Sequence, residues 1–110
     1  MDRLERHDWV NAVEAFKKVL EVNPIDPVAR KNLAVLYYQL GRDSEALTQV
    51  EQNIQFGIEP AISYGLLGQI RERQGDLAAA QAAYEKSLTF DPQNTVTLQL
   101  LTNLKVQLPP

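Results

Sequence analysis

The sequence contains no cysteine and a single histidine in 110 residues. Without cysteine, the chain has neither a disulfide framework nor a thiolate metal site, which is compatible with the cytosol without establishing it. The histidine, His7, precedes a predicted helix and is interpreted as a solvated turn residue. Because a glycine-rich phosphate loop and a metal-binding spacing are also missing, we expect no catalytic centre, no metal and no cofactor. The chain is predicted not to be an enzyme.

The chain also has only a small excess of acidic over basic residues, and its apolar runs are short. The net charge is −3, and 45% of the residues are apolar against 23% charged, which is ordinary for one folded domain. The basic residues Arg30, Lys31, Arg71 and Arg73 form no stripe with interleaved aromatics, so no nucleic-acid partner is expected. No apolar run approaches the roughly 20 residues of a membrane span, and the charged first residues do not resemble a signal peptide.

The sequence has instead a regular period of 34 residues. Ala12, Ala46 and Ala80 are spaced at this interval, and so are Gly41 and Gly75. Three sets of large apolar residues follow the same period: Leu20, Ile54 and Leu88; Leu33, Leu67 and Leu101; Leu36, Ile70 and Leu104. A fixed interval of this size is typical of stacked supersecondary units and not of one globular core.

Proline and glycine divide the chain into six predicted helices. The first is expected over 8–22, with Asp8 as its N-cap. The second begins after Asp26, where Pro27 takes the first helical position, and ends at Gly41, because glycine allows the left-handed turn that closes a helix. Further helices are expected over about 43–56, 60–74, 76–90 and 95–108, the fifth capped by Asp76. Short connections make consecutive helices antiparallel.

The last of these segments carries two patterns. Val96, Leu98 and Leu100 alternate as in a strand, whereas apolar residues of the same segment also fall on one helical face. The 34-residue register favours a helix, because Leu101 and Leu104 continue the apolar positions of the second and fourth helices.

The pattern resembles the tetratricopeptide repeat family. Residues 61–94 carry the resemblance most fully, with Tyr64, Leu67, Gly68, Gly75, Ala80, Tyr84 and Pro92 at the family's positions. Residues 27–60 also match through Leu33, Ala34, Tyr37, Gly41 and Ala46, but Val50, Asn53 and Ile58 depart from the usual residue types. Residues 8–22 match the second helix of a partial repeat, and 95–108 match the first helix of a partial repeat or a capping helix.

The resemblance implies an all-α fold. We expect one array over 1–110, a right-handed α-solenoid of antiparallel helix pairs with about six helices. Helices are expected to approach most closely at Ala12, Ala46, Ala80 and Gly68. Tyr37 and Tyr84 are expected where wider gaps must be filled. Two interpretations of the ends stay open: the chain is a piece of a longer array, or its last helix is a cap or a dimer contact.

The resemblance also implies a function, namely binding a peptide or helix of a protein partner in the concave groove, as a scaffold or complex-assembly factor. The alternative is a structural array that forms a homodimer through 95–108. Helical phase predicts that the groove is lined by Val28, Lys31, Val35, Tyr38 and Gln39, then by Ile62, Gly65, Gln69, Glu72 and Arg73, and finally by Val96, Gln99 and Asn103.

One subset of the family grips the C-terminal carboxylate of chaperones with a lysine, asparagines and further basic residues. Lys31 stands at the lysine place, but Val35 replaces the asparagine one turn later, and Gly65 and Leu66 offer no polar group. A chaperone tail is therefore not the expected ligand. The mixture of apolar and polar groove residues suits an extended peptide or an amphipathic helix.

Overall fold

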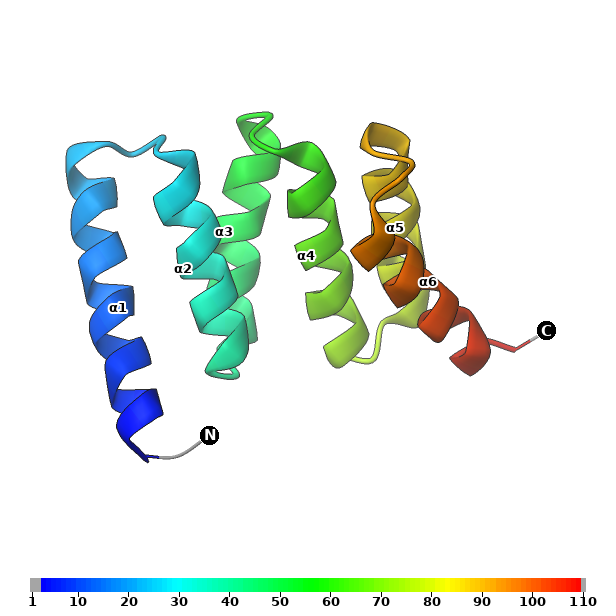
Figure 1. Cartoon of the computed structure of the whole chain (residues 1–110), viewed down its shortest axis with the longest axis horizontal. Coiled ribbons are helices and arrows are strands. Elements are labelled where there is room, and N and C mark those ends of the chain that lie inside the picture. The colour runs from blue at the N-terminus through cyan, green and yellow to red at the C-terminus, as the bar shows by residue number, and fades with distance from the viewer. Residues whose placement is uncertain (1–2, 110) are drawn as a thin grey trace.

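The computed structural model describes the backbone of residues 3–109 and the side chains of residues 7–109. This part of the chain forms six α-helices and no strand: α1 (Arg3–Val22), α2 (Pro27–Gln39), α3 (Asp43–Gln55), α4 (Pro60–Arg73), α5 (Leu77–Phe90) and α6 (Thr95–Gln107). Figure 1 shows the helices following one another in a row, with consecutive helices running in opposite directions. The predicted all-α solenoid is confirmed, including a helix where the last segment also alternated.

The first helix is longer than the sequence pattern indicated. It begins at Arg3, and Asp8, the expected N-cap, lies inside it. Residues 3–8 contain neither proline nor glycine, so nothing in the local sequence prevents the helix from extending through them. The other helix ends fall within about one residue of their predicted places.

Side-chain caps fix two of these helix starts as predicted. Asp26 Oδ1 accepts a hydrogen bond from the backbone N–H of Ala29 at 2.8 Å, and Asp76 Oδ1 accepts one from Ala79 at 3.1 Å. Each carboxylate satisfies a backbone donor that would have no partner within the helix. Gly75 follows α4 with a φ of 83°, in the left-handed region that glycine enters without steric cost.

The smallest side chains of the repeat lie between neighbouring helices, although Ala12 is only partly buried. Ala46 and Ala80 are fully buried. Gly68 on α4 lies directly against the ring of Tyr84 on α5, and a Cβ added at Gly68 would come within 2.4 Å of two ring carbons. The period of small residues therefore fixes the spacing between neighbouring helices.

The array buries its apolar side chains between successive helices. One cluster contains residues of all four helices from α1 through α4 and is centred on Leu33, Tyr37 and Ile70. A second cluster joins α5 and α6 around Tyr84 and Leu104. Substantial contacts join each helix to the next, and α2 also contacts α4. The even-numbered helices therefore lie together along one face, which positions the site described below.

Candidate functional site

Helices α2, α4 and α6 line a face with two adjoining hollows. The first, of about 250 Å³, lies between α4 and α6 and is lined by Ala61, Ile62, Gly65, Leu66, Gln69, Asn94, Val96, Thr97 and Leu100. The second, of about 320 Å³, extends to α2 and is lined by Tyr38, Gln69, Glu72, Arg73, Tyr84, Leu100 and Gln107. The two hollows share Gln69 and Leu100, so they form one continuous depression, here called the groove.

The structure brings several of the predicted residues together in the groove. Ile62, Gly65, Gln69 and Val96 line the first hollow, and Tyr38, Gln69, Glu72 and Arg73 line the second. Val28, Lys31, Val35, Gln39, Gln99 and Asn103 line neither hollow.

Seven residues that helical phase did not select also line the groove, among them Leu100 and Gln107. Leu100 stands one period after Leu66, which lines the same hollow, so the 34-residue register would have found it. Gln107, in the last turn of α6, stands one period after Arg73, which lines the second hollow, so the same register would have found it.

Gly65 forms the floor of the first hollow and offers no side chain to a ligand. The polar groups below it are already satisfied, because Ser87 Oγ donates to the carbonyl of Ala61 at 2.6 Å and lies 3.2 Å from Thr97 Oγ1. A Cβ added at Gly65 would meet Thr97 Oγ1 at 3.4 Å, an ordinary contact. The floor is thus a packed junction of α4, α5 and α6.

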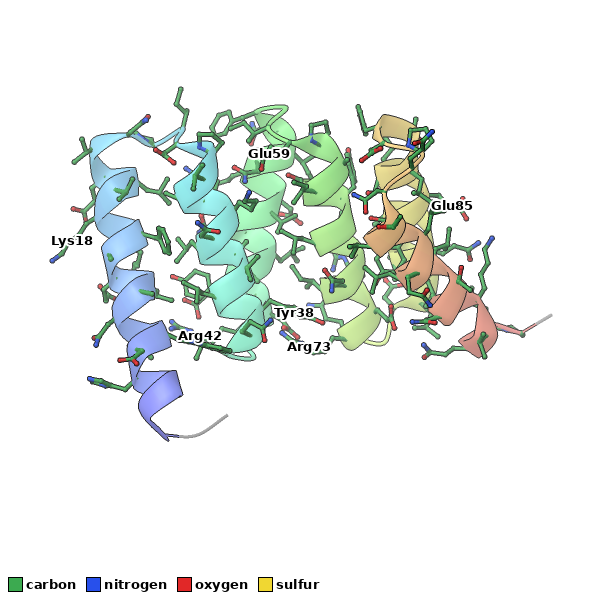
Figure 2. All side chains as sticks on the ribbon, viewed as in Figure 1. Lys18, Tyr38, Arg42, Glu59, Arg73 and Glu85 are labelled. Atoms are coloured by element: carbon green, nitrogen blue, oxygen red, sulfur yellow. The ribbon has the colours of Figure 1, made fainter. Side chains whose placement is uncertain are left out.

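Arg73 borders the second hollow, where it is held by neighbouring residues of the protein. Its Nε donates to Asp43 Oδ1 at 2.9 Å, its Nη2 donates to the carbonyl of Tyr38 at 2.6 Å, and its guanidinium lies 3.7 Å from the centre of the Tyr38 ring. Figure 2 shows Tyr38 and Arg73 close together at the lower ends of α2 and α4. The hydrogen bond to Asp43 raises the pKa of Arg73. Arg73 therefore orients Tyr38, and its charge is paired within the array.

Glu72 is the carboxylate of the groove, and it too has partners. Its Oε1 accepts a hydrogen bond from the Tyr84 hydroxyl at 2.8 Å, and its Oε2 accepts one from Gln107 Nε2 at 3.4 Å. Burial, reinforced by this hydrogen bond, raises the pKa of Tyr84 well above its ordinary value. The hydroxyl therefore stays protonated at neutral pH and serves as a donor.

Lys31, the residue at the lysine place of a carboxylate clamp, is paired as well. Its Nζ lies 3.5 Å from Glu59 Oε2. Glu59 precedes α4 in the left-handed region, with a φ of 41°. Val35, one turn after Lys31, is half-buried. The complete clamp that the resemblance raised is therefore not assembled here.

Arg30 is the buried charge that sequence reasoning missed. It is 7% exposed on α2, where Nη1 donates to Gln49 Oε1 at 3.1 Å, and burial lowers its pKa. Arg30 stands one period before Tyr64, and the two residues make equivalent contacts. The Arg30 guanidinium lies 5.9 Å from the centre of the Phe56 ring, and the Tyr64 ring lies 6.0 Å from the Phe90 ring. Arg30 thus occupies an aromatic position of the repeat and packs between helices.

The described residues form neither a membrane-spanning helix nor a metal-binding cluster. Among the helices of residues 3–109, none has the length and apolar character needed to cross a membrane. Within the described side chains, no three histidines or carboxylates gather in a way that could hold a metal ion. The groove is the candidate site that the described residues provide.

Family models and known proteins match the chain over most of its length. Two models described as tetratricopeptide repeat match residues 3–52 and 61–94. The small glutamine-rich tetratricopeptide repeat-containing protein 2 of Mycosarcoma maydis is 32% identical over 101 residues, covering 92% of this chain and 29% of the relative. BBSome complex member BBS4 of Mus musculus is 33% identical over 96 residues, covering 87% and 18%. The chain therefore spans less than a third of these relatives.

Solved structures show the same arrangement of helices. The first TPR of Spaghetti (RPAP3), bound to the HSP90 peptide SRMEEVD, superposes with a TM-score of 0.84 at 20% identity, covering 94% of this chain and 82% of that one. The Sgt2 TPR domain from Aspergillus fumigatus gives a TM-score of 0.84 at 20% identity, covering 97% and 78%. At this level of identity the likeness establishes the fold.

Proposed function

The chain belongs to the tetratricopeptide repeat family, and we propose that it binds a peptide or helix of a protein partner in the groove between α2, α4 and α6. The family is one of protein-interaction modules and is generally non-catalytic. In this proposal the chain acts as a scaffold or complex-assembly factor, and its own residues supply the docking surface.

The observation that carries the proposal is the continuity of the groove. Gln69 and Leu100 line both hollows, so a single ligand can contact α2, α4 and α6 together. Such a ligand would touch helices from three successive repeat units, which no one unit could offer alone. The peptide-bound RPAP3 structure and the related Hsp70-Hsp90 organizing protein of Triticum aestivum, 33% identical over 79 residues, support a peptide ligand as the class of partner.

A pull-down with the chain as bait tests this surface. The double variant Lys31→Glu, Gln69→Ala should lose the partner while keeping its helical circular dichroism, because both changes lie on or beside the groove and neither side chain is fully buried. Lys18→Glu is the matched control, since Lys18 lies on α1 and points away from the array (Figure 2). If the partner stays bound to the double variant, the groove is the wrong surface.

A second candidate is self-association through α6. Val96, Leu98 and Val106 on this helix are exposed by 67%, 43% and 83%. We expect a homodimer of this kind to be weakened by Val106→Glu, because a charge would be buried in the contact. Light scattering after size exclusion would contradict the candidate if it gave a monomer mass at every protein concentration.

A further inference from the structure

The first turns of the groove helices carry an apolar row. Val28, Ile62 and Val96 stand 34 residues apart, each in the first turn of its helix, and are exposed by 55%, 40% and 67%. The hollow of about 250 Å³ opens between the last two of them. The same repeat that builds the core thus also places apolar side chains at the groove.

The walls of this hollow contain no ionisable side chain. Two of its polar groups are already used, because Asn94 Oδ1 accepts from the backbone N–H of Thr97 at 3.0 Å and Thr97 Oγ1 lies 3.2 Å from Ser87 Oγ. A charged side chain entering here would lose its hydration and gain no counter-charge, which is unfavourable. An apolar side chain would move from water into contact with apolar residues, which is favourable.

Gln69 is the polar side chain left for a ligand. It lines both hollows, and within residues 7–109 its amide makes no side-chain hydrogen bond. A glutamine amide presents both a donor and an acceptor, which match the C=O and N–H of a peptide group. An extended backbone has these groups free, while a helix uses them internally, so the amide favours an extended ligand.

The charges that border the groove have partners within the chain. Lys31 Nζ lies 3.5 Å from Glu59 Oε2, and Arg73 Nε donates to Asp43 at 2.9 Å. Glu72 accepts the hydroxyl of a buried tyrosine. A carboxylate on the ligand would have to compete with these pairs, which disfavours an acidic tail.

From these contacts we infer that the partner segment is uncharged and extended, and that it inserts one apolar side chain of leucine or phenylalanine size between Ile62 and Val96. Gln69 holds the adjacent backbone. The inference rests on the proposed function, because it specifies the ligand of the same groove.

Selection from two displayed peptide libraries tests the inference. In one library the random segment is internal, with chain on both sides of it, and in the other the random segment ends in a free C-terminus. We expect the whole chain to enrich internal segments that have one large apolar anchor and few acidic residues. A synthetic version with blocked ends should lose about tenfold in affinity, by fluorescence anisotropy, when the anchor becomes alanine. Val96→Glu and the near-isosteric Gln69→Leu should each weaken it to a similar extent.

Val22→Glu is the matched control for Val96→Glu, because Val22 is 89% exposed at the end of α1 and lines neither hollow. It should bind as the parent does. Enrichment of acidic peptides, or of peptides that need a free carboxylate, would overturn the inference. The proposed function would still stand in that case if Gln69→Ala abolished the binding of those peptides. Peptides indifferent to Gln69 and Val96, or no enrichment at all, would overturn both.

Discussion

Replacing Gly68 by alanine adds one methyl group at the tightest approach between two helices. The new Cβ would lie 2.4 Å from two carbons of the Tyr84 ring and 3.0 Å from a third. The ring has little room to move, because Tyr84 is fully buried and its hydroxyl donates to Glu72 at 2.8 Å. Either the two helices must separate or the tyrosine must leave its rotamer and weaken that hydrogen bond.

The cost follows from these contacts. Overpacking of this kind costs about 1–3 kcal/mol, and loss of the tyrosine hydrogen bond adds about 1 kcal/mol. The better helix propensity of alanine offsets about 1 kcal/mol. We therefore expect Gly68→Ala to lower the free energy of unfolding by about 1–3 kcal/mol, or the melting temperature by roughly 4–8 °C for each kcal/mol.

Urea unfolding followed by circular dichroism would measure the loss. Gly65→Ala is the matched control on the same helix, because its Cβ would meet Thr97 Oγ1 at 3.4 Å and should be neutral or stabilising by up to about 1 kcal/mol. Ala34 and Val50 stand one period before Gly68 and Tyr84, so the preceding repeat already combines alanine with a smaller partner. Gly68→Ala should accordingly cost less in a Tyr84→Val background. A Gly68→Ala protein as stable as the parent would refute the reasoning.

Three further measurements follow from the structure. Because the pKa of Tyr84 is raised, the folded chain retains a proton that the unfolded chain releases above about pH 10. The free energy of unfolding should therefore fall as pH rises above about 10. Urea titrations at several pH values should show a weaker pH dependence for Tyr84→Phe. Arg73→Lys should lose about 1 kcal/mol, because lysine keeps the charge but neither stacks on Tyr38 nor forks onto Asp43; stability equal to the parent would contradict that role. Asn53→Ser should be neutral or stabilising in thermal melts, because the buried Oδ1 of Asn53 has no partner within the described residues; a loss above about 1 kcal/mol would contradict this prediction.

The sequence predicted much of the fold because its signals act over a few residues. Asp26, Asp76 and Gly75 set helix ends through hydrogen bonds and backbone angles within four residues of themselves, and each behaves as predicted. Asp8 did not, because a capping residue type stops a helix only where the preceding residues cannot continue it.

The groove was predicted less completely, because helical phase gives the direction of a side chain and not its partners. Phase selected Gln69, Ile62 and Gly65, which all line the first hollow, but it did not show that Gly65 forms a floor without a side chain to offer a ligand. It placed Arg73 and Lys31 in the groove without showing that each has a carboxylate partner from another helix or loop.

The amino-acid sequence by itself determined six helices, most of their ends and their 34-residue stacking, since propensity, capping and periodic small residues are encoded in neighbouring positions. Only the tertiary structure decided which groove side chains remain available to a ligand. Asp43 and Arg73 are separated by 30 residues, and the tyrosine and the glycine that it packs against belong to different helices. Whether a charge is paired or a hollow is left unfilled depends on how the helices are brought together in space, and not on any one stretch of chain.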